Sequence, residues 1–219
     1  MDEAIHAFLL GFPALFSIVN PISGAFIFRE VTAGPLVLQR QRLARKVATY
    51  SLVVMMGALW AGSFVLAFFG ITLAALRVAG GVVVALTGWN LLTQPEQHEE
   101  RKQEQATTAE GADDVALFPM TMPITTGPGT IAVAVALSAS RPRTFEGFAG
   151  FFVGMTGAAV ALALVIWITY RSTDRISRLM GQAGSRSVTR LSAFLLVCIG
   201  VQILITGVED VLGPLLARH

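Results

Sequence analysis

Long apolar runs alternate with short polar segments along the whole chain. Six of these runs are long enough to cross a bilayer, which takes roughly 20 apolar residues. Apolar side chains cover every face of a helical period in these runs, which is typical of membrane helices and not of amphipathic helices in a soluble bundle. The predicted spans are residues 5–28, 47–69, 72–92, 115–139, 147–170 and 189–208.

The composition agrees with a membrane-embedded chain. Of the 219 residues, 54% are hydrophobic and only 14% are charged. A water-soluble domain of this length needs far more polar surface. The sequence therefore predicts an all-α membrane protein with six transmembrane helices.

The basic residues are distributed unevenly between the loops. Twelve of the 16 Lys and Arg residues fall in the loops after the first, third and fifth spans. Because basic residues concentrate on the cytoplasmic side, we predict that these three loops are cytoplasmic and that both termini are periplasmic. Arg77 and Arg190 lie near the first residues of their spans and are expected to reach the membrane interface.

A polar segment divides the chain into two halves with three spans each. Residues 94–114 hold seven acidic and two basic residues. We interpret this segment as a solvated cytoplasmic linker, and a partner-binding segment is the less favoured alternative. The first three-helix repeat is then residues 1–93, and the second is residues 115–219.

The two halves have related patterns. VNPISGAFIF (19–28) can be aligned with TGPGTIAVAV (126–135), and LRVAGGVVVALTGWNLL (76–92) with TRLSAFLLVCIGVQILI (189–205). With three spans in each half, the second half enters the membrane from the opposite side. The pattern predicts a 3+3 inverted repeat, an arrangement that recurs in transporters.

Helix-breaking residues interrupt the first and fourth spans near the midplane, at equivalent places in the two halves. Backbone groups freed at a break cannot face lipid, so they face protein or a water-filled cavity. A restarting half-helix points its N-terminus at that cavity and suits a carboxylate. The alternative is that these residues only kink the helices. The predicted substrate-binding residues are Asn20, Pro21, Ser23, Gly24, Thr125, Thr126, Gly127, Pro128, Gly129 and Thr130.

No pattern in the chain indicates catalysis. His6, His98 and His219 are scattered, and the chain has no HExxH, Walker or CxxC motif. A loose dinucleotide fingerprint begins at Gly127, but it lacks the preceding strand and the acidic residue that such a site needs. The lone Cys198 cannot form an intrachain disulfide. We therefore expect no enzyme activity, no cofactor and no bound metal.

Four stretches resemble the MarC family of six-span bacterial inner-membrane proteins. The resemblance implies a multi-pass protein of the bacterial inner membrane, related to neutral amino acid transporters and amino acid exporters. It also implies that Asn20, Pro21, Gly24, Gly127 and Pro128, with Gly129, are signature positions. The four stretches are VNPISGAFIF (19–28), LRVAGG (76–81), MPITTGPGTIA (122–132) and RLSAFLLVCIGVQILITGV (190–208).

These features predict a secondary transporter or exporter of small neutral solutes, such as amino acids. The alternative is a non-transporting membrane protein with a regulatory or assembly role. The expected partners are the lipid bilayer and a small neutral solute, with a homo-oligomer left open. Nucleic acid is not an expected partner.

Overall fold

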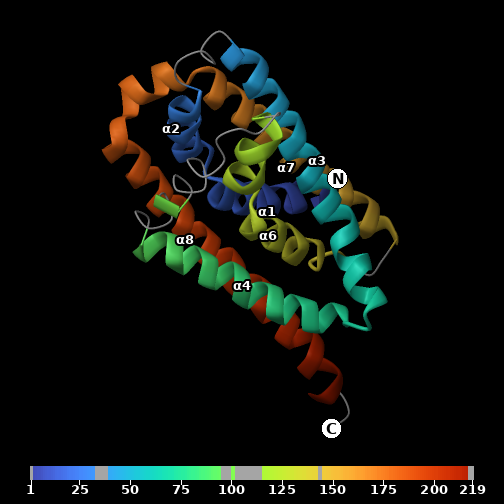
Figure 1. Cartoon of the computed structure of the whole chain (residues 1–219). Helices are drawn as coiled ribbons and strands as arrows, with labels where there is room; N and C mark the ends of the chain where they lie inside the picture. Colours follow the sequence, from blue (N-terminus) through green and yellow to red (C-terminus); the bar gives the residue numbers. More distant parts are fainter. Residues whose placement is uncertain (1, 33–38, 95–99, 102–114, 143–144, 217–219) are drawn as a thin grey trace.

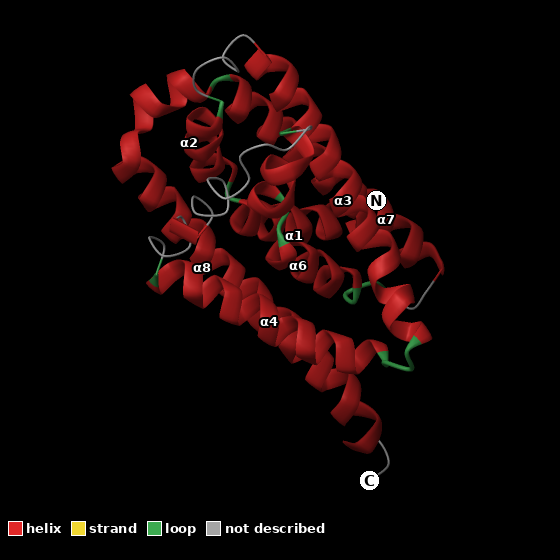
Figure 2. Cartoon of the chain, in the orientation of Figure 1, coloured by secondary structure: helices red, strands yellow, loops and turns green. Residues whose placement is uncertain are grey.

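The computed structural model describes residues 2–32, 39–94, 100–101, 115–142 and 145–216. Every regular element in these stretches is a helix, and none of them contains a strand (Figure 2). The predicted all-helical fold is therefore confirmed. The elements are α1 (Asp2–Val19), α2 (Pro21–Val31), α3 (Arg40–Phe68), α4 (Leu73–Thr93), the π-helix η2 (Ala116–Thr125), α6 (Pro128–Ser138), α7 (Phe145–Arg171) and α8 (Thr173–Leu216).

Several of these helices have the length and composition of membrane spans. In the described part of the chain, four stretches pass this test, and the bent pair of η2 and α6 makes a fifth. All but the last residue of the predicted span 47–69 lies in α3, which does not pass this test, so the sixth span stays a prediction. The four stretches are Asp2–Val31, Leu73–Thr93, Gly147–Arg171 and Ala183–Leu212.

Helices α4 and α8 pack side by side in antiparallel directions (Figure 1). Glycines make the close approach possible. A Cβ atom at Gly88 would lie 2.7 Å from the backbone nitrogen of Val197, and one at Gly207 would lie 2.7 Å from that of Val78. Small residues at such contacts are a general device of membrane helices, whose backbones gain dispersion energy by approaching closely.

Helix α7 lies beside α3 and contacts α1, α2 and α3 (Figure 1). Met155, Leu162, Ile166 and Tyr170 are among the largest fully buried side chains, and all four come from α7. Because these positions are spaced by seven, four and four residues, one face of α7 forms much of the core.

Helix α8 begins earlier than the sequence predicts. Residues 173–188 were expected in a loop, but α8 starts at Thr173 and continues with a kink at Gly181, where φ is +58°. The Thr173 hydroxyl donates a buried hydrogen bond of 2.5 Å to the carbonyl of Ala25 in α2. This tertiary contact holds the first turn of α8, and a local sequence pattern does not reveal it.

Arg77 is buried, whereas the sequence analysis expected it to reach the interface. Its side chain donates to the carbonyls of Ala139 and Arg141, each at 2.7 Å, and pairs with Asp210. Ala139 is the C-terminal cap of α6 and Arg141 follows two residues later, so one guanidinium supplies donors to carbonyls just beyond the last turn. We call this group the Arg77 clamp. Arg190, the matched residue of the second half, is exposed.

A comparable group holds the end of α2. Arg40 donates to the hydroxyl of Thr32 at 2.9 Å and to its carbonyl at 3.2 Å. Thr32 is the C-terminal cap of α2. Arg40 also pairs with Asp174 at 2.9 Å, and Arg29 lies 3.2 Å from the same carboxylate. We call this group the Arg40 clamp. Each clamp ties the last turn of a short helix to an aspartate of α8.

Replacing Arg77 with Met should destabilise the protein, because Asp210 and two helix-end carbonyls lose a charged donor. We expect a loss of about 2 kcal/mol, which lowers Tm by about 4–8 °C in a chain of this size. Thermal unfolding of the detergent-purified protein measures it. Arg190→Met is the matched control and should change Tm by less than about 2 °C. Equal shifts in the two variants would contradict the clamp.

Candidate functional site

The first span is interrupted at Asn20, between α1 and α2. Asn20 has a φ of +48°, in the left-handed region that asparagine tolerates better than most residues. Its side-chain oxygen accepts a hydrogen bond of 3.3 Å from the backbone N–H of Ser23. Pro21 follows at the first helical position, where its missing N–H has no cost. Thus α2 starts with its own cap.

Polar side chains of α8 cover this interruption. The Asn20 amide donates to the hydroxyl of Thr189 at 2.8 Å, and the hydroxyls of Ser23 and Ser185 lie 3.0 Å apart. The hydroxyl of Ser17 lies 2.7 Å from the carbonyl of Ser192. All of these residues are buried. The α8 hydroxyl row, Ser185, Thr189 and Ser192, therefore supplies partners for the first break from the other half of the chain.

The fourth span is interrupted more strongly. Its two parts, η2 and α6, are bent by 62°. Within η2 the hydroxyls of Thr121, Thr125 and Thr126 donate to carbonyls five residues earlier, at 2.6, 2.6 and 3.1 Å. Pro119 and Pro123 lie inside η2 and carry no N–H, so they donate no backbone hydrogen bonds in it, and the threonine hydroxyls add donors to the same segment.

The start of α6 differs from the start of α2. Gly127 precedes α6 in an extended conformation and makes no side-chain cap, because it has no side chain. Pro128 is exposed in the isolated chain, and Gly127 and Gly129 are partly exposed. The first turn of α6 therefore presents backbone groups at a partly open surface, with the positive end of the helix dipole.

One side chain lies between the two breaks. Tyr170 is fully buried, and its hydroxyl lies 2.9 Å from the hydroxyl of Thr125 at the end of η2. The same tyrosine contacts α2, because a Cβ atom at Gly24 would lie 3.2 Å from its Cζ and closer still to its hydroxyl. Its ring stacks on Phe28 with centroids 4.8 Å apart. The two interruptions are thus neighbours, joined through α7.

The predicted site residues fall into three groups. Gly24 and Thr125 meet at Tyr170. Asn20 and Ser23 contact the α8 hydroxyl row and not the second break. The third group lies at the start of α6. In this group Thr126 and Thr130 are buried, and the three residues between them are more exposed to solvent. Pro21 is buried beside Asn20.

Sequence reasoning missed four polar residues that complete this region. Tyr170 was placed at the end of a predicted span without a role, and the α8 hydroxyl row was not recognised. Its members recur at intervals of four and three residues, which places them on one face of a helix. That spacing was the sequence feature that could have predicted a polar face on this helix.

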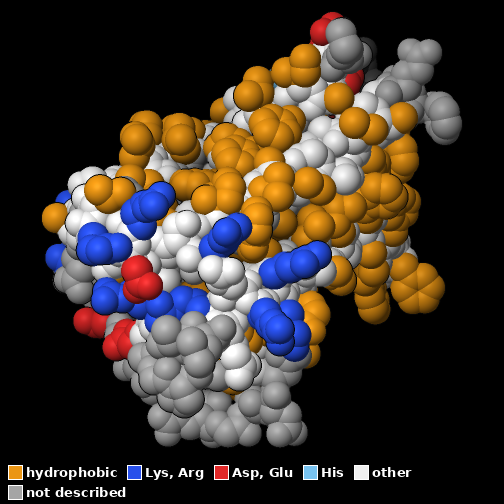
Figure 3. Space-filling model, turned by 90° about the horizontal axis from the view of Figure 1, so that it is seen from above, with side chains coloured by type: hydrophobic (Ala, Val, Ile, Leu, Met, Phe, Trp, Pro, Cys, Tyr) orange, Lys and Arg blue, Asp and Glu red, His pale blue; other side chains and the backbone are white. Residues whose placement is uncertain are grey.

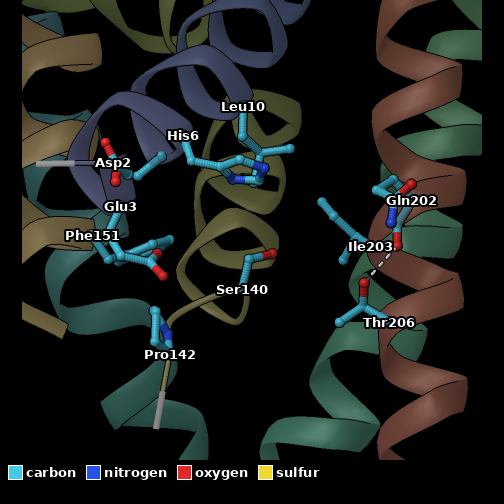
Figure 4. Close-up of a pocket in the computed structure, with 11 residues that line it drawn as sticks. Asp2, Glu3, His6, Leu10, Ser140, Pro142, Phe151, Gln202, Ile203 and Thr206 are labelled. Carbon is cyan, nitrogen blue, oxygen red and sulfur yellow. Dashed lines mark hydrogen bonds between the residues drawn. The ribbon is translucent and has the colours of Figure 1, made fainter. Parts of the chain in front are cut away.

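A cavity of about 400 Å³ opens beside the far end of α6. Figure 4 shows His6 and Leu10 of α1 on one side and Gln202 and Thr206 of α8 on the other, with Ser140 between them. None of the predicted site residues lines it. Nearby, burial and, to a lesser degree, the charge of Arg77 lower the pKa of Arg141.

The helices and the interrupted spans define an integral membrane protein with polar residues buried at its helix breaks. Comparison with known proteins gives the family. Residues 5–212 match the family described as MarC family integral membrane protein, and the chain belongs to this family.

Relatives named UPF0056 inner membrane protein MarC match the chain over almost its whole length. The relative in Salmonella paratyphi A is 34% identical over 218 residues, and the one in Citrobacter koseri is 33% identical over 218 residues. Each alignment covers 97% of this chain and 98% of the relative. No solved structure matches the chain.

The conformation of Asn20 leads to a test with two substitutions. Asn20→Gly loses the amide contacts but accepts the positive φ, so we expect a stability loss of about 1 kcal/mol. Asn20→Ala loses the same contacts and must also hold a Cβ in the left-handed region, so we expect about 2 kcal/mol. Thermal unfolding in detergent compares them. A variant with Ala as stable as the one with Gly would contradict the strained cap.

Proposed function

We propose that this protein is a secondary transporter or exporter that moves small neutral solutes, such as amino acids, across the inner membrane. The observation that carries the proposal is the meeting of two interrupted helices at Tyr170. A membrane helix has little reason to abandon its backbone hydrogen bonds at a buried position unless the freed groups serve a site.

The contacts of the short helices support an inverted repeat with α3 as the sixth span. Helix α2 contacts α7 and α8, and α6 contacts α3 and α4. Each short helix therefore packs against the second and third spans of the opposite half. Two halves related by a two-fold axis in the membrane plane would show this reciprocal pattern of contacts. Transporters place their solute at the interface between such halves.

The two breaks suit different parts of a zwitterionic solute. The uncapped start of α6, Gly127-Pro128-Gly129, is the better place for a carboxylate, because its backbone N–H groups and helix dipole favour negative charge. The buried hydroxyls of Thr125 and Thr130 are acceptors for an ammonium group. Asn20, Pro21 and Ser23, at the capped start of α2, would then form the opposite wall of the binding site.

Tyr170 closes the space between the breaks in this structure. Its hydroxyl contacts both Gly24 and Thr125, so a solute at the start of α6 cannot pass α2 while the tyrosine stays in place. We infer that the path between the two breaks is closed in this conformation and that transport requires the ring to move. Alternating access by movement of one half against the other supplies such a step.

Solute flux in liposomes tests the proposal. We expect reconstituted protein to exchange radiolabelled neutral amino acids faster than protein-free vesicles. Thr125→Val removes a hydroxyl from the site and should reduce the flux. Thr87→Val is a matched control, since its hydroxyl bonds only to the carbonyl of Val83 within α4. Folded protein without flux for any solute in a neutral amino acid panel would instead favour the regulatory or assembly role.

A second test uses the contact between Gly24 and Tyr170. The methyl group of Gly24→Ala would overlap the tyrosine hydroxyl, and overpacking of this size costs about 1–3 kcal/mol, enough to lower flux about tenfold. Gly57→Ala is the control, because a Cβ there meets nothing within 4 Å.

Adding Tyr170→Phe to Gly24→Ala should restore part of the flux, because the clashing oxygen is gone. All fluxes are divided by the amount of folded protein recovered from size-exclusion chromatography. If Gly24→Ala and Gly57→Ala transport equally well, Tyr170 does not control the path.

A further inference from the structure

A second cavity, of about 460 Å³, lies where α7 ends and α8 begins. Its lining includes Trp167, Arg171, Ser172, Arg175 and Arg178, together with Gln41 from α3. Three arginines within eight residues thus face one hollow. This is the end of the molecule that carries the Arg40 clamp, and Figure 3 shows Lys and Arg side chains gathered at one end of a largely apolar surface.

The charge of the cavity is positive despite the presence of a carboxylate. Asp174 also lines it, but Arg29 and Arg40 lie 3.2 and 2.9 Å from its oxygens and offset its charge. Among the described residues, Arg171 and Arg175 make no ion pair, and Arg178 donates only to the backbone carbonyl of Asp174, at 3.2 Å. Their guanidinium groups are therefore available to an anion.

The cavity lies at the depth of the membrane surface. The apolar span Gly147–Arg171 ends at its wall. Arg171 stacks over the ring of Trp167 at 5.4 Å, and Ile168, which also lines the cavity, is 54% exposed. Tryptophan at a span end is typical of the level of the lipid headgroups. The cavity thus has a polar floor of arginines and an apolar edge that faces the acyl chains.

We propose that this cavity binds the phosphate headgroup of an anionic phospholipid. Arginine forks match phosphate oxygens, and basic pockets at the ends of membrane helices on the cytoplasmic side recognise such headgroups. Ser172 and Gln41 add neutral donors to the same hollow. A lipid fits better than free phosphate because Trp167 and Ile168 continue the cavity into the apolar surface. This proposal is independent of the transport proposal.

The test measures thermal unfolding of delipidated protein in a neutral detergent. Phosphatidylglycerol should raise Tm by about 5 °C at saturation, and phosphatidylcholine should not. Inorganic phosphate at the same concentration should also leave Tm unchanged. An equal shift with inorganic phosphate would show that the site takes the free anion and would overturn the lipid assignment.

Variants locate the binding. The double substitution Arg171→Gln with Arg175→Gln should remove most of the shift. Gln41→Glu, which brings a negative charge to the cavity wall without disturbing the helices, should weaken it as well. Arg42→Gln with Arg45→Gln is the matched control, because both are exposed basic residues outside the cavity. A full shift in the first two variants, or an equal loss in the control, would overturn the proposed site.

Discussion

The structure depends on one constraint, which is that backbone polar groups freed inside a membrane must find partners within the protein. Small polar side chains meet this need at both breaks. At the first break the amide of Asn20 caps α2 and reaches Thr189 of α8. At the second, threonine hydroxyls of η2 donate to carbonyls five residues back, in a segment that also contains two prolines. Proline and glycine create the interruptions, and neighbouring hydroxyls make them tolerable.

Ion-paired arginines fix the outer ends of both short helices. Arg40 holds the last turn of α2 and Arg77 the last turn of α6, and each arginine pairs with an aspartate of α8, Asp174 or Asp210. The two aspartates lie near opposite ends of that helix. Helix α8 therefore fixes the outer ends of both short helices at once. In the proposed transporter, opening a path between the halves requires movement near Tyr170.

Local pattern was sufficient for the helical class, for most span positions and for both interruptions. The reason is that hydrophobic runs, Asn20-Pro21 and Gly127-Pro128-Gly129 act within one or two turns. What it missed depends on residues distant in sequence. Thr189 lies 169 positions from Asn20, and Asp210 lies 133 from Arg77. The local sequence around a basic residue near a span end does not show whether its side chain reaches the interface. Arg77 is instead buried and pairs with a carboxylate that is distant in sequence.

The two halves are not equivalent in chemistry, although their patterns align. The first turn of α2 starts with a side-chain cap and is largely buried, and its Ser23 contacts the α8 hydroxyl row. The first turn of α6 follows Gly127, has no side-chain cap and is more exposed. The start of α6 therefore suits an anion better, because no capping side chain has to leave. In the proposed transporter, the first half therefore contributes mainly a packing surface, and the second half contributes the binding groups.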